Sequence, residues 1–143
     1  MEVCYIPLWT VESVLTDPET LYIFGDNDIG KGKRGQAVIR GLHNAMGIPT
    51  KRLPSLIAAS FYSDRNFLKH SLSISTAVDS IIERCRTSEF KRLALPKDGF
   101  GTGLAHLKIK APQVFAFLEK EVQRLIKAVE ELGTRSTLNE TKK

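Results

Sequence analysis

The sequence predicts a single α/β domain of three layers, in which helices cover both faces of a mostly parallel or mixed sheet. Strand-like and helix-like segments alternate along the 143 residues, the strand-like segments are continuous apolar runs, and glycine-rich loops follow two of them. Apolar residues make up 42% of the chain, which is enough for one buried core. We expect this domain over 1–133 and a disordered polar tail over 134–143.

In the first half of the chain, Val3–Ile6 is expected to form a short strand, and Thr10 to cap a short helix. Leu21–Phe24 has the unbroken apolar character of a strand buried on both faces. The apolar residues of Gln36–Met46 fall roughly on one helical face, and Gly47 is expected to end that helix.

In the second half, Leu56–Tyr62 is a second apolar run and is expected to form a strand. Leu72–Cys85 follows helical spacing, with Ser71 as its expected cap. Arg92–Leu95 predicts the next strand. The final helix is expected over 112–133, because it begins with proline and ends at glycine.

Composition limits the cellular setting and the partners. No apolar run approaches the roughly 20 residues of a membrane helix, and the N-terminus lacks the features of a signal peptide. Cys4 and Cys85 suggest reduced thiols rather than a disulfide framework, so a cytoplasmic protein is expected. The net charge of +5 suits an anionic ligand or a nucleic acid.

The most informative stretch is 21–40, which reads LYIFGDNDIGKGKRGQAVIR. An apolar strand runs into a loop with glycines at 25, 30, 32 and 35, and a helix is expected to begin near Gln36. Such a loop presents free backbone N–H groups, and the helix dipole adds positive potential. Lys31, Lys33 and Arg34 lie in the same loop. A site for a phosphate-bearing ligand is therefore predicted.

A second glycine loop, GFGTG over 99–103, follows the strand-like LALP. The carboxyl ends of parallel strands meet at one edge of a sheet, where α/β domains bind their ligands. The sequence therefore predicts that both loops line one pocket.

Two familiar phosphate-binding patterns fit the first loop poorly. Gly30, Gly32 and Gly35 spell GxGxxG, but they start five residues beyond the strand, and no acid lies between Asp28 and Asp64 to bind a ribose. The stretch 25–31 fits GxxxxGK, but glycine follows where a magnesium-binding hydroxyl is needed.

A third pattern fits better. FGDN, the glycine loop and GQAVIRG resemble the first ligand-binding region of macrodomains, and LALPKDGFGTGLAHL resembles their late strand and phosphate loop. Within that superfamily the chain is most similar to the divergent branch of terminal ADP-ribose protein glycohydrolases. The resemblance covers roughly 21–50 and 92–107. The first stretch is also similar to FGDN…GKGGQAxIRG in small phage-encoded proteins.

The resemblance implies a site for ADP-ribose or a related nucleotide diphosphate. Asp26 and Asn27 would hold the distal ribose. The backbone at Gly30, Gly32 and Gly35, with Gln36 after it, would line the approach to the ribose. The diphosphate would lie against the second loop, at Gly99, Phe100, Gly101, Thr102 and Gly103.

The resemblance also implies a possible chemistry, the release of ADP-ribose from a modified protein or nucleic acid. In the glycohydrolases a lysine attacks the anomeric carbon, and Lys51 falls near that place. Their catalytic aspartate corresponds to Ala105 here, so Asp98 is the nearest acid. Binding without catalysis, for instance to sequester a nucleotide signal, is the alternative.

Simpler interpretations stay open for the same residues. Asp26 and Asn27 suit an Asx turn, the cations suit a solvated basic turn, and Phe61, Tyr62 and Phe100 suit core packing as well as base stacking. The histidines and cysteines have no metal-ligand spacing, and no cofactor is expected. A nucleic-acid-binding module that uses the basic residues, and an interaction domain without a ligand, are the competing functions.

Overall fold

The computed structural model describes residues 1–100 and 106–142, with the side chains of 1–100 and 106–132. The described residues form a four-stranded sheet of order β1-β4-β2-β3, in which every neighbouring pair is parallel. The strands are β1 (Glu2–Ile6), β2 (Thr20–Asn27), β3 (Ala45–Lys51) and β4 (Arg92–Pro96). The predicted α/β class is confirmed.

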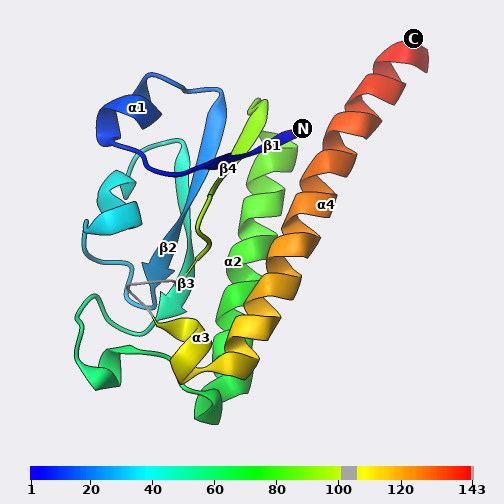
Figure 1. Ribbon diagram of the computed structural model, residues 1–143. Coiled ribbons are helices and arrows are strands. Elements are labelled where there is room, and N and C mark those ends of the chain that lie inside the picture. The colour runs from blue at the N-terminus through cyan, green and yellow to red at the C-terminus, as the bar shows by residue number, and fades with distance from the viewer. Residues whose placement is uncertain (101–105, 143) are drawn as a thin grey trace.

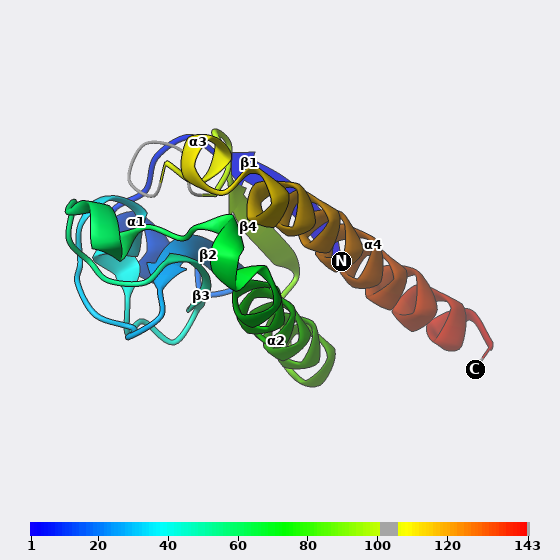
Figure 2. The same cartoon turned by 90° about the horizontal axis from the view of Figure 1, so that it is seen from below.

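Helices cover both faces of this sheet (Figure 1). The α-helices are α1 (Val11–Leu15), α2 (Phe67–Thr87), α3 (Leu107–Lys110) and α4 (Pro112–Lys142), and the 3-10 helices are η1 (Gly35–Ile39), η2 (Ala58–Ser60) and η3 (Asp64–Asn66). Figure 2 shows α2 and α4 on one side of the strands, with α1 on the other. None of the helices in the described part of the chain is long and apolar enough to span a bilayer.

The two faces of β2 explain why its sequence is an unbroken apolar run. Leu21 and Ile23 point into the core beneath α2 and α4, whereas Tyr22 and Phe24 pack with residues of α1 and η1. Successive side chains of a strand point to opposite faces, so a strand covered on both sides is apolar at every position.

The helix predicted over Gln36–Met46 is wrong. Only η1 is helical, and it is a 3-10 helix that ends before Gly41, whose φ of +89° is a conformation that favours glycine. Residues 40–44 form a turn, and β3 begins at Ala45, within the segment predicted to be helical. Gly47, the expected helix stop, lies inside β3, where a Cβ atom would come within 2.7 Å of the Asp26 side chain. Pairing with β2 outweighs a weak helical pattern.

The strand predicted over Leu56–Tyr62 is also wrong. That segment contains η2, and its link to the sheet is an isolated bridge from Phe61 to Lys51. Leu56 and Ile57 are exposed while Phe61 and Tyr62 are buried. An apolar run cannot by itself distinguish a strand from a loop whose side chains are divided between solvent and core.

The predicted helix ends are correct in part. Thr10 caps α1 as expected, in a reciprocal capping box with Ser13. Helix α2 begins at Phe67, so Ser71 lies inside it and is not its cap. Helix α4 begins at Pro112 but continues past Gly133, where its end was expected. The domain boundary at 133 stays a prediction.

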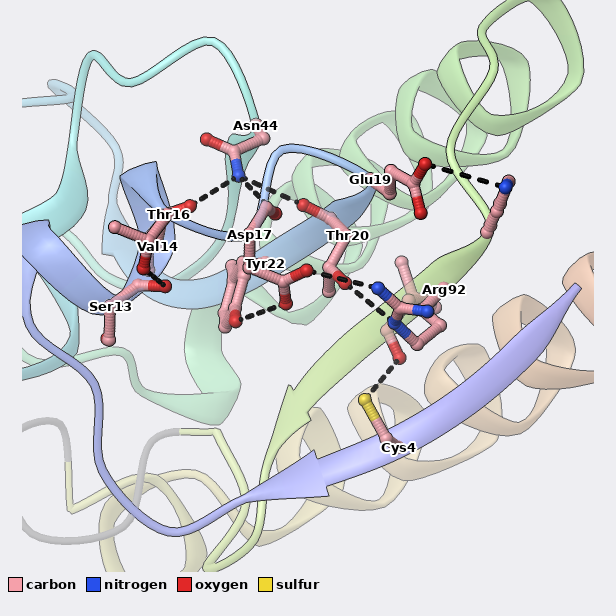
Figure 3. Close-up of polar contacts among 12 residues, drawn as sticks. Cys4, Ser13, Val14, Thr16, Asp17, Glu19, Thr20, Tyr22, Asn44 and Arg92 are labelled. Carbon is pink, nitrogen blue, oxygen red and sulfur yellow. Dashed lines mark hydrogen bonds and ion pairs between the residues drawn. The ribbon is translucent and has the colours of Figure 1, made fainter.

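A polar network holds the amino-terminal edge of the sheet, opposite the strand ends that carry the glycine loops (Figure 3). The buried Asn44 side chain donates to the carbonyls of Val14, Asp17 and Thr20, at 2.9, 3.1 and 3.1 Å. The Tyr22 hydroxyl donates to the Asp17 carboxylate at 2.8 Å. Burial, together with this hydrogen bond, raises the pKa of Tyr22 to about 12. This network joins α1, the turn after it and the start of β2.

Candidate functional site

A cleft of about 880 Å³ opens at the carboxyl edge of the sheet, and we call it the strand-end cleft. It lies at a topological switch point. The chain leaves β2 towards η1 on one face of the sheet, and leaves the neighbouring β4 towards α4 on the other. The lining residues come from segments that follow all four strands: 6–9, 25–27 with 31–37, 50–51 with 54–56, and Pro96 with Asp98.

The first glycine loop is closed by Asn27. The Asn27 side chain donates to the Lys31 carbonyl at 2.7 Å and accepts from the Lys31 N–H at 3.3 Å. Gly30, Gly32 and Gly35 have φ values of +61°, +95° and +57°, so glycine is needed at each of these turns. Asn27 was predicted to hold a ribose, and the structure engages both polar atoms of its side chain within the loop.

Arg40 is a central residue of this loop that the sequence analysis missed. Its guanidinium donates to the Gly32 carbonyl at 2.8 Å and to the Lys31 carbonyl at 3.3 Å, and it forms an ion pair with Asp26. It also lies 5.3 Å from the centre of the Phe24 ring. Arg40 lies within the helix predicted over Gln36–Met46 but is not one of its apolar residues, and an arginine in that position is ordinarily exposed to solvent. Asp26 lines the cleft with its carboxylate already paired.

Gln36 connects the two predicted loops. Its side-chain oxygen accepts from the Gly25 N–H at 2.8 Å, and its side-chain nitrogen donates to the Gly99 carbonyl at 3.3 Å. The Trp9 indole donates to the Gln36 carbonyl at 3.0 Å. Gln36 thus joins the end of β2 to the start of the second loop, and the prediction that the whole of both loops lines one pocket stays a prediction.

The second loop is described only in part. Gly99 has a φ of +85°. Phe100 is buried in the core beneath α2 and α4, so its ring does not form a surface on which a base could stack. Asp98 lines the cleft. The predicted residues Gly101, Thr102 and Gly103 lie outside the described residues, as does Ala105.

Lys51 ends β3 and lines the cleft, although it is buried. Burial lowers the pKa of its ammonium group. The Lys51 Nζ atom donates to the Ser55 carbonyl at 3.3 Å and lies 5.7 Å from the centre of the Phe61 ring. The surroundings of Lys51 therefore favour the neutral amine, which is the form that a nucleophilic lysine needs.

The cleft is lined by both cationic and apolar residues. Lys31, Lys33 and Arg34 are exposed along the first loop. The apolar lining consists mainly of aliphatic side chains and Trp9, in the segments 6–9 and 54–56. Leu8 and Leu56 are 84% and 64% exposed at this lining. The sequence did not predict Leu8 and Leu56 as site residues, because neither lies in a recognisable motif.

A buried cluster behind the first loop explains the fate of Tyr62. Its hydroxyl donates to Asp28, which directly follows β2, and its ring stacks on His70 with 3.7 Å between the ring centres. Both His70 nitrogens are buried without a hydrogen-bond partner, and burial lowers the pKa of this imidazole. Tyr62 therefore belongs to the core rather than to a base-binding surface.

This cluster is expected to make the free energy of unfolding depend on pH. In the unfolded chain His70 takes up its proton near the usual pKa of 6.5, whereas the fold favours the neutral ring. The contribution of His70 to the free energy of unfolding should be fully present above pH 6.5. It should decrease as the pH drops from there to about 5. His70→Phe, which keeps a ring against Tyr62, should flatten this slope in urea unfolding. Exposed His43→Phe is the control, and an equal flattening there would contradict the assignment.

The geometry above can be set beside known proteins. Residues 4–121 match a family model described as a family of unknown function, DUF7831. No curated protein and no solved structure shows a significant match to the chain. The resemblance to macrodomains therefore stays a prediction.

Proposed function

Since the chain belongs to DUF7831, a family of unknown function, we propose its function from the geometry of the strand-end cleft: it binds ADP-ribose or a related nucleotide diphosphate. One observation carries this proposal. The glycine loop after β2 and the turn after β4 that contains Asp98 both line the same cleft, and Gln36 hydrogen-bonds to Gly25 in β2 and to Gly99 after β4. A diphosphate is the kind of ligand that the backbone amides of the first loop can hold.

The charges at the cleft favour an anion. Four cationic side chains line it, Lys31, Lys33, Arg34 and Lys51. The acidic side chains among the described lining residues are those of Asp26 and Asp98, and Asp26 is neutralised by Arg40. The potential inside the cleft is therefore positive, and it attracts phosphate groups.

Backbone amides add directional donors. The N–H groups of Gly32, Lys33 and Arg34 donate to no acceptor within the described part of the chain. These three residues line the cleft. The expected helix dipole contributes little here, because the element that follows is the short 3-10 helix η1 rather than an α-helix. The loop amides thus take the place of the predicted helix terminus.

The size of the cleft and its apolar lining residues suit the remainder of the ligand. A volume of about 880 Å³ lies within the range of small-molecule sites. The wall formed by 6–9, which includes Trp9, offers an apolar surface for a nucleobase. Asp26 and Asn27 are already bonded to protein groups, so a ribose would meet them through their remaining acceptor positions.

Binding can be tested with a matched pair of glycine variants. A Cβ atom at Gly32 would lie 3.2 Å from the Cβ of Pro54, a cleft residue, whereas at Gly41 nothing lies within 4 Å. Both positions have a positive φ, so both variants bear a similar backbone cost. We expect Gly32→Ala to weaken ADP-ribose binding by at least about tenfold in calorimetry, and Gly41→Ala to leave it near the wild-type value.

The wild-type measurement decides the proposal itself. ADP-ribose at about 100 times its dissociation constant should add about 2.7 kcal/mol to the free energy of unfolding. Absence of any stabilisation by ADP-ribose, ADP and AMP would exclude a nucleotide site. A single-stranded oligonucleotide whose affinity falls by a decade or more between about 50 and about 200 mM salt would favour the nucleic-acid-binding function instead.

Hydrolysis at the anomeric carbon of bound ADP-ribose is a second candidate function, favoured by the buried, desolvated ammonium of Lys51. We expect Lys51→Met to abolish release of ADP-ribose from a modified protein while it keeps ADP-ribose binding within about threefold. Lys110→Met is the matched control, because the Lys110 Nζ atom lies 5.3 Å from the same Phe61 ring but the residue is exposed and does not line the cleft. Equal loss in both variants would argue against Lys51 as the nucleophile.

A further inference from the structure

Gln36 occupies an unusual position between the two strand-end loops. It is the second residue of η1, yet its side chain reaches the N–H of Gly25 at the end of β2 and the carbonyl of Gly99, 63 residues away in sequence. Its own backbone carbonyl is held by the Trp9 indole at 3.0 Å. The end of β2 and the segments that follow β1 and β4 therefore converge on one side chain and its backbone.

The two bonds need a side chain that both accepts and donates. Gly25 offers a donor and Gly99 offers an acceptor, and an amide presents one oxygen and one NH₂ group to match them. A carboxylate of the same shape accepts at both ends, so it keeps the first bond and repels the carbonyl at the second. A protonated carboxyl group again presents one acceptor and one donor.

We infer that Gln36 is a positioning residue, which fixes the first glycine loop against the turn after β4, whose Asp98 lines the cleft, so that the cleft keeps the shape that a diphosphate needs. It acts on the ligand through Gly25 and Gly99 rather than as the ligand contact that the sequence predicts. Phosphate groups would bind weakly if the turn after β4 moved away from the first loop, because the amides of that loop would no longer be held in one orientation. For its ligand, this inference rests on the proposed function.

The Gln36→Glu variant tests the two hydrogen bonds separately, because it should lose one and keep the other. Near pH 7.5 the carboxylate should keep the Gly25 N–H protected in amide hydrogen exchange and lose the Gly99 contact. Near pH 4.5, close to the usual glutamate pKa of about 4.3, the protonated fraction should restore it. The Gly99 and Phe100 amide resonances of the free protein should therefore move with pH in this variant. An unchanged Trp9 indole resonance would show that the surrounding fold is intact.

Ligand binding provides the second readout. We expect Gln36→Glu to weaken ADP-ribose binding by about tenfold or more near pH 7.5, and to recover most of that loss near pH 4.5. The diphosphate keeps its charge over this range, so each variant is compared with wild type at the same pH. Gln113→Glu, an exposed residue at the start of α4 with the same charge change, should show neither the loss nor the recovery.

The outcomes distinguish this inference from the proposed function. If wild type binds ADP-ribose and Gln36→Glu binds equally well at both pH values, the positioning role is overturned while the binding function stands. If the Gly99 and Phe100 resonances of the free variant do not respond to pH, the link between the loops is overturned whether or not a nucleotide binds. If wild type does not bind ADP-ribose but those resonances respond, the link stands and the proposed ligand is wrong.

Discussion

Replacement of Arg40 by methionine is expected to lower the free energy of unfolding by about 3 kcal/mol and to remove nucleotide binding. The Arg40 and Asp26 side chains are each 17% exposed, so their ion pair is largely shielded from water. Its loss leaves the Gly32 carbonyl without its donor, removes one of two donors from the Lys31 carbonyl, and leaves the Asp26 carboxylate without its counter-charge. The glycine loop then loses the contacts that hold it at Gly32, and its amides are no longer held in one orientation.

Urea unfolding and calorimetry with ADP-ribose measure the two effects. Arg86→Met is the control, because its ion pair with Glu83 is 58% exposed on both sides and should contribute nothing measurable. In Asp26→Asn the unpaired charge is absent, so Arg40→Met should cost less in that background. An Arg40→Met protein that binds ADP-ribose like wild type would contradict the role of Arg40 in shaping the loop.

Asn44→Ala is expected to cost a similar amount, about 3 kcal/mol, at the opposite edge of the sheet. The Asn44 side chain is fully buried and is the donor to three main-chain carbonyls, from α1, the following turn and β2 (Figure 3). Alanine leaves these carbonyls without that donor and opens a small void. The loss should act on stability alone, because the cleft lies at the other ends of the strands.

Asn66→Ala is the matched control for this substitution. Asn66 is exposed at the start of α2 and makes no capping hydrogen bond through its side chain, so its loss should change the free energy of unfolding by less than about 0.5 kcal/mol. Below its own unfolding transition, Asn44→Ala should bind ADP-ribose as tightly as wild type. A reduced affinity in folded Asn44→Ala would show that the two edges of the sheet are coupled.

The parts of the fold that the sequence predicts correctly are those with a strong local signal. Leu21–Phe24 is apolar at every position because both faces of β2 are covered, and that pattern is legible without a structure. The capping box of Thr10 and the proline at the start of α4 are equally local. The edge strand β3 is not, because its residues AMGIPTK contain a glycine and a proline that argue against a strand.

The site was predictable in its location but not in its internal contacts. Glycine at 30, 32 and 35 marks turns of positive φ, and strand-end loops of a parallel sheet share one edge. The partners of Asp26, Asn27 and Gln36 are backbone groups or a side chain beyond the loop, and no motif specifies them.

The sequence by itself therefore determined the α/β class, the strand that leads to the site and the glycine loops at its edge, because each follows from short-range periodicity or backbone freedom. The tertiary structure decided which segment pairs as β3, which arginine neutralises Asp26, and how Gln36 bonds to Gly99, 63 residues away. Those outcomes depend on contacts between residues far apart in the chain, whose free energy outweighs local propensity. They become visible only when the chain is folded.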